Sequence, residues 1–109
     1  MNEMCIHKME WNPMPVKGFE GKPLMEHKNG GLKMVKIMPG SVFPLHQHPD
    51  KTEFAYVIEG TLEATIGDTK KIGNIGTFYQ FPLGINHSLK NPSETETIVL
   101  IGSFSEVKS

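Results

Sequence analysis

The stretch that decides the fold covers residues 40–60 and reads GSVFPLHQHPDKTEFAYVIEG. Most of these side chains are apolar, β-branched or aromatic, as is typical of a strand, yet two histidines and a glutamate interrupt the central part. On an extended strand, residues two apart in the sequence point to the same face. His46 and His48 therefore share a face, and their imidazoles can converge on one ion.

Glu53 follows His48 by five residues, an odd offset that on a straight strand would put the carboxylate on the opposite face. The residues between them are typical of a turn, because Pro49 fixes φ and Asp50 can hydrogen-bond its own backbone. We therefore expect the chain to double back. Glu53 would then enter from the neighbouring antiparallel strand and add an oxygen to the two nitrogens.

A second stretch, residues 76–91, reads GTFYQFPLGINHSLKN. Its proline and glycine predict a turn, and in the strand after it Ile85, His87 and Leu89 share one face. A lone histidine on an apolar face is more often a core residue than a metal ligand. Burying several imidazoles and a carboxylate together is costly without a shared partner, and a divalent cation is the simplest one. The predicted metal ligands are His46, His48, Glu53 and His87.

These two stretches carry both motifs of the cupin superfamily. The first motif is a glycine, five residues, His-x-His, four residues, a glutamate, six residues and a glycine. The second is a glycine, five residues, Pro-x-Gly, two residues, a histidine, three residues and an asparagine. Besides the four ligands, the fixed positions are Gly40, Gly60, Gly76, Pro82, Gly84 and Asn91. At residue frequencies of roughly 5–7%, ten such positions would coincide by chance about once in 10¹² sequences.

With only fifteen residues between the motifs, 61–75, the chain resembles the small single-domain microbial cupins. The resemblance implies an all-β fold, a double-stranded β-helix or jelly-roll-type β-barrel. It also implies one divalent transition metal per chain, held by the four ligands named above. The family often forms homodimers, and a homodimer is therefore expected.

The composition independently favours an all-β domain. The chain has 109 residues, including 11 glycines and 8 prolines spread along its length, and no long segment has helical periodicity. We expect one domain, with an N-terminal arm and edge strands over 1–30 and a β-barrel core over 31–109. The predicted strands are 9–11, 24–27, 32–38, 42–48, 53–59, 61–66, 77–81, 85–90 and 97–104.

Charge excludes some classes of partner. The formal net charge is −1 and all 11 basic residues are scattered lysines, which argues against nucleic acid or a membrane surface as partner. Without arginine, an acidic ligand would need a lysine or a metal ion. Cys5 is the only cysteine, and no apolar stretch is typical of a signal peptide or a membrane-spanning helix. A cytoplasmic location is therefore expected.

Strand 53–59 is apolar on both faces. Ala55 and Val57 share a face with Glu53, while Phe54, Tyr56 and Ile58 lie opposite. The second face would be covered by a partner subunit or by the N-terminal arm. The expected wall of the site, for which ordinary core packing is the alternative, consists of Phe43, Ala55, Val57, Phe78, Phe81, Ile85 and Leu89.

The ligand set constrains the chemistry without fixing it. Three imidazoles and one carboxylate suit Fe, Mn, Co, Ni, Cu or Zn as divalent ions. We predict a metal-dependent enzyme acting on a small molecule, with dioxygenase chemistry as the leading hypothesis. The alternatives are an isomerase, decarboxylase or lyase using the metal as a Lewis acid, a non-catalytic module that binds or senses a small molecule, and a structural barrel with an incidental metal. No catalytic residue beyond the ligands is predicted.

Overall fold

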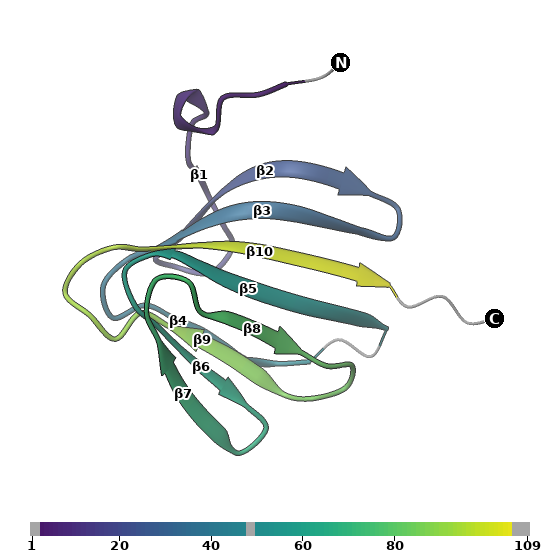
Figure 1. Cartoon of the computed structure of the whole chain (residues 1–109), viewed down its shortest axis with the longest axis vertical. Coiled ribbons are helices and arrows are strands. Elements are labelled where there is room, and N and C mark those ends of the chain that lie inside the picture. Colours follow the sequence, from purple (N-terminus) through teal and green to yellow (C-terminus); the bar gives the residue numbers. More distant parts are fainter. Residues whose placement is uncertain (1–2, 48–49, 106–109) are drawn as a thin grey trace.

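The computed structural model describes residues 3–47 and 50–105, which form two antiparallel β-sheets (Figure 1). His48, one of the four predicted ligands, lies outside the described residues. The larger sheet has the order β1 (Asn12–Pro13), β2 (Phe19–His27), β3 (Gly30–Ile37), β10 (Thr97–Ser105), β5 (Lys51–Glu59) and β8 (Phe78–Phe81). The smaller sheet has the order β4 (Val42–His46), β9 (His87–Lys90), β6 (Leu62–Ile66) and β7 (Thr69–Gly73).

The hydrophobic core lies between the two sheets and follows the alternation of the strands. Ala55 and Val57 on β5 are fully buried, whereas Tyr56 and Ile58 between and after them are exposed. The smaller sheet contributes Leu62, Ala64 and Leu89 to the same cluster, which the larger sheet completes with Phe19, Val35, Ile37, Ala55, Val57, Tyr79, Phe81 and Val99. The predicted all-β sandwich is confirmed.

The structure lacks one predicted strand and has two that were not predicted, β1 and β7. Residues 9–11 form no strand: a single turn of 3-10 helix, η1 (Ile6–Lys8), precedes the two-residue β1. The edge strand β7 was not predicted, because four of its five residues are exposed and it lacks a buried apolar face.

The N-terminal segment packs on β2 and β3, on the face opposite the core. The Trp11 ring lies 4.4 Å from Lys22 Nζ and 4.8 Å from Lys36 Nζ, and Lys22 Nζ donates a 2.8 Å hydrogen bond to the carbonyl of Ile6. The strands that carry these contacts, β2 and β3, lie toward the β1 edge of the sheet, away from β5 and β8 (Figure 1). The arm does not cover the outer face of β5, where Tyr56 remains 39% exposed.

Two residues of the fixed motif positions have clear structural roles. Gly60 has a φ of +83°, and a Cβ there would lie 2.8 Å from the Glu96 carbonyl oxygen, so a side chain does not fit. Asn91 is fully buried and joins the end of β3 to the loop before β10. Its amide donates to the carbonyls of Ile37 and Thr95 at 2.9 and 2.7 Å, and its oxygen accepts from Ser93.

No helix within the described ranges is long and apolar enough to cross a lipid bilayer.

Candidate metal centre

Three of the four predicted ligands meet between the sheets. His46 ends β4 and His87 begins β9, and the two are register partners in the smaller sheet. Glu53 belongs to β5 of the larger sheet. Its Oε1 atom lies 3.0 Å from His87 Nε2 and 3.7 Å from His46 Nε2. Atoms able to bind a metal, one from each residue, all lie within 4.8 Å of one another.

The expected route of Glu53 into the site was wrong. Glu53 does not come from a strand hydrogen-bonded to β4, because β4 and β5 belong to different sheets. Both edges of β5 are paired along the part that carries Glu53, with β10 on one side and β8 on the other. The carboxylate therefore faces the histidines across the interior of the sandwich.

Backbone carbonyls set the orientation of both imidazoles. His46 Nδ1 lies 2.9 Å from the Pro44 carbonyl oxygen, and His87 Nδ1 lies 3.3 Å from that of Ile85. A carbonyl oxygen can only accept, so in each of these contacts Nδ1 is the donor when it carries the ring proton. In that tautomer Nε2 would offer its lone pair on the side of Glu53, which is the arrangement that second-shell carbonyls give to metal-binding histidines.

This donor set fits a divalent transition metal. A carboxylate oxygen and two Nε2 atoms can approach one another closely only with a cation between them, either a proton on a ring or a metal ion. Imidazole nitrogen and carboxylate oxygen suit the first-row transition metals predicted from the sequence. We therefore assign a candidate metal site to His46, Glu53 and His87, and the identity of the ion stays open.

Aromatic rings pack against both histidines of the candidate site. The Phe81 ring stacks on His87 with centroids 4.4 Å apart and an interplanar angle of 15°. Phe43 packs on His46 at 4.7 Å and is itself met by Phe19 at 5.5 Å. His87 is only 3% exposed. The contacts limit rotation of both rings and keep water from one side of the site.

A cavity of about 60 Å³ opens beside the three candidate ligands. Its lining is mostly apolar: Met14, Phe19, Lys33, Val35, Phe43, His46, Glu53, Phe54, Phe81, His87, Leu89 and Ile101. Three of the predicted wall residues, Phe43, Phe81 and Leu89, are among these lining residues.

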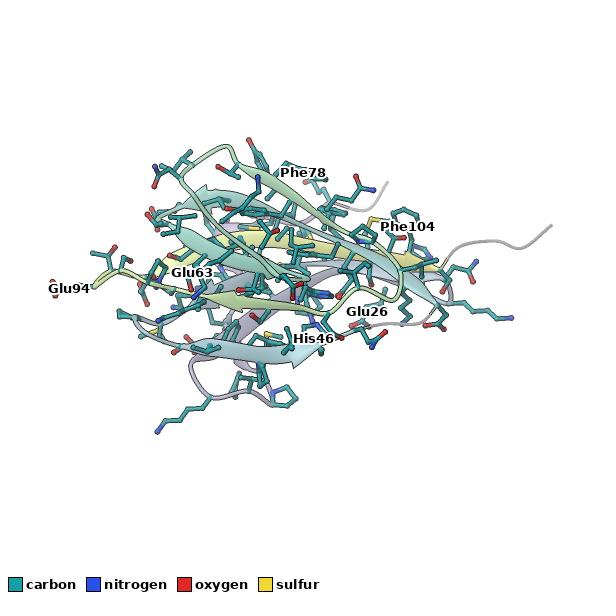
Figure 2. The ribbon with its side chains drawn as sticks, turned by 90° about the horizontal axis from the view of Figure 1, so that it is seen from below. Glu26, His46, Glu63, Phe78, Glu94 and Phe104 are labelled. Carbon is teal, nitrogen blue, oxygen red and sulfur yellow. The ribbon has the colours of Figure 1, made fainter. Side chains whose placement is uncertain are left out.

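The other four predicted wall residues lie elsewhere. Ala55 and Val57 are fully buried in the core and do not reach this cavity. Phe78 is exposed, because it alternates with the inward-facing Tyr79 of β8. In Figure 2, Phe78 lies at the upper surface and His46 at the lower side of the molecule. Ile85 is exposed too, because β9 begins only at His87 and the expected alternation does not extend back to it.

Sequence reasoning missed Lys33, the one lysine in the lining described above. The alternation of β3 could have indicated this residue. Val35 and Ile37 are fully buried, and Lys33 lies on the same face of the strand as these two residues. A lysine on the inward face of a strand is unusual enough to indicate a site.

Comparison with known proteins gives a family match. A family model described as a cupin domain matches residues 33–102. Germin-like protein subfamily 2 member 2 of Arabidopsis thaliana is 36% identical over 74 residues, which cover 63% of this chain and 34% of that protein. Oxalate decarboxylase OxdC of Bacillus subtilis is 35% identical over 80 residues, or 66% of this chain and 20% of that protein. The chain thus spans about a third and a fifth of these relatives.

Among solved structures, KdgF from a Halomonas species superposes with a TM-score of 0.87. The superposition covers 99% of this chain and 96% of that one at 19% sequence identity. At this identity the likeness shows the shared fold alone.

Proposed function

Since the chain belongs to the cupin family, we propose that it is a mononuclear metal enzyme acting on a small molecule in the cavity beside His46, Glu53 and His87. The observation that carries this proposal is the convergence of these ligand atoms within 4.8 Å, with both Nδ1 atoms turned to backbone carbonyls. Four ligands would be excessive for an incidental ion, and an ion beside a cavity can meet a substrate.

His46, Glu53 and His87 would hold the ion, and His48 is proposed as the fourth ligand on the motif spacing alone. When bound, such an ion supplies Lewis-acid polarisation of a ligand oxygen and, if it is redox-active, the means to activate dioxygen. The apolar wall made by Phe43, Phe81 and their neighbours excludes water from the reacting molecule. The carbonyls behind the imidazoles can accept from Nδ1, which would leave Nε2 of each ring to bind the ion.

Dioxygenase chemistry is the reaction class that we propose first. Apart from Lys33 and the candidate ligands, the described cavity wall offers no side chain that could act as a general acid or base. Reactions that depend chiefly on a metal ion and dioxygen need few such groups.

A second candidate is Lewis-acid chemistry such as decarboxylation. It is favoured by the 35% identity to oxalate decarboxylase OxdC over 66% of this chain. It would use the same ligands and would consume no dioxygen.

The test begins with metal analysis of protein purified anaerobically without chelators. Oxygen uptake is then followed with a catechol, a thiol and a 1,3-diketone, with product analysis in parallel. We expect turnover in the wild-type chain and in His27→Ala, whose histidine is exposed and lies outside both motifs, and none in His87→Ala. Full metal occupancy with no product from these three substrates would contradict the proposed dioxygenase chemistry and would support decarboxylation or a binding or sensing module instead.

A further inference from the structure

Lys33 lies in the cavity wall with the candidate metal ligands. The same lysine also lines a second pocket, together with Glu53, Ile101 and Ser103. Lys33 therefore borders both the cavity beside the candidate ligands and this second pocket. In the sheet, Lys33 pairs in register with Ile101 of β10, which in turn pairs with Ala55 of β5. Glu53 is the residue two before Ala55 on the same face.

The other lysines on this part of the sheet have partners. Lys22 Nζ donates to the Ile6 carbonyl, and Lys36 Nζ lies 3.4 Å from Glu20 and 3.6 Å from Glu96. For Lys33, the described ranges contain neither a hydrogen bond nor an ion pair of its side chain. Glu53, the one carboxylate in the described cavity wall, is directed to the two imidazoles instead.

Lys33 is half-buried and lines the cavity together with Met14, Phe19 and Val35. An ammonium that faces such an apolar wall has fewer water molecules around it than one in open solvent. That loss is unfavourable unless an anion or another polar group replaces the water. With a divalent ion on the candidate ligands, the positive charge in the cavity would exceed the single negative charge of Glu53. Both arguments favour a ligand that brings a negative charge.

We propose that the cavity binds a small carboxylic acid in its ionised form, with the Lys33 ammonium donating to the carboxylate. A second oxygen of the acid would point to the site of His46, Glu53 and His87. This inference rests on the proposed metal function. A cavity of about 60 Å³ restricts the ligand to a few non-hydrogen atoms. Because the chain has no arginine, a lysine is the strongest cationic donor that it can offer.

The test compares lactate with lactamide, which have nearly the same shape but differ in charge. Binding of each to cobalt(II)-loaded protein is measured by titration calorimetry, for the wild type, Lys33→Met and the control Lys70→Met, whose lysine is exposed on β7. We expect Lys33→Met to weaken lactate binding by about tenfold or more, the effect of losing one charge-assisted hydrogen bond. Its lactamide affinity and its cobalt content should not change, and Lys70→Met should match the wild type.

Lys33→Arg keeps the charge and should retain most of the preference for lactate, which separates loss of charge from a folding defect. Equal lactate affinity in Lys33→Met and the wild type would overturn the proposal, and so would a wild type that binds lactate no better than lactamide. If the wild type binds no cobalt, the proposed metal function fails, and the same titration without metal still decides whether Lys33 recognises the carboxylate.

Discussion

Tyr79 buries a phenol between the two sheets. Its hydroxyl lies 3.4 Å from the Leu62 carbonyl oxygen and 3.5 Å from that of Lys71, so it can donate to one of them. Burial raises the pKa of Tyr79 above its ordinary value of 10.0. The unfolded chain therefore releases this proton at a lower pH than the folded chain. The stability that depends on the neutral phenol is fully present below about pH 10 and is lost as the pH rises through the raised folded pKa.

Replacing Tyr79 with Phe should have opposite consequences in the two pH ranges. At neutral pH the variant should lose about 1 kcal/mol of unfolding free energy with its hydrogen bond. Above about pH 10 its stability should fall less steeply than that of the wild type. Urea unfolding at several pH values measures both effects, with Tyr56→Phe as the exposed control. Parallel stability curves for Tyr79→Phe and the wild type would contradict this account.

At the level of residues, the sequence was most informative where the motif spacing is strict. His46, Glu53 and His87 were predicted as one cluster and the structure brings them together. Lys33 lies outside both motifs and was not predicted, although strand alternation puts it on the buried side of β3. Ile85 was misplaced because a strand boundary is set by tertiary contacts as well as by local pattern.

Among the structural elements, the loop before β10 depends on one side chain. Asn91→Ala would remove the amide that satisfies the Ile37 and Thr95 carbonyls and the oxygen that accepts from Ser93. We expect a loss of about 2–4 kcal/mol, because buried polar groups would be left without partners. Chemical denaturation measures it. The control is Asn86→Ala, at an exposed asparagine, whose unfolding free energy should stay within about 0.5 kcal/mol of the wild-type value. An equal loss of stability in both variants would contradict the role assigned to Asn91.

Most strands could be predicted from turn residues and period-two alternation, whereas their distribution between the sheets could not. Local sequence indicates that β4 and β5 are extended and that a turn separates them. It does not reveal that β5 pairs with β10, more than forty residues later, rather than with β4. That choice depends on long-range packing of both faces. For the same reason, the expected turn predicted that Glu53 would meet the histidines, but it gave the wrong sheet for the approach of the carboxylate.

For the whole molecule, the outer face of the larger sheet exposes several large apolar side chains. Tyr56, Ile58 and Phe78 are 39%, 38% and 57% exposed on it, and Phe54 stacks on Phe78 at 5.3 Å. A homodimer through this face stays a prediction from the sequence. Sedimentation equilibrium should give twice the mass of one chain, and Tyr56→Glu should give the mass of a single chain because it would bury a charge in the interface. A wild type with the mass of one chain would contradict the prediction.

The central claim is that the chain holds one divalent transition metal between its two sheets. The most direct measurement is the metal content of protein loaded with cobalt(II) and dialysed, compared among the wild type, Glu53→Gln and Glu59→Gln. Glu59 is an exposed glutamate at the end of the same strand. The wild type and Glu59→Gln should retain one ion per chain. Glu53→Gln should bind it at least about tenfold more weakly, since even loss of an outer-shell partner has that effect. Equal retention by Glu53→Gln and the wild type, or no retention by either, would contradict the claim.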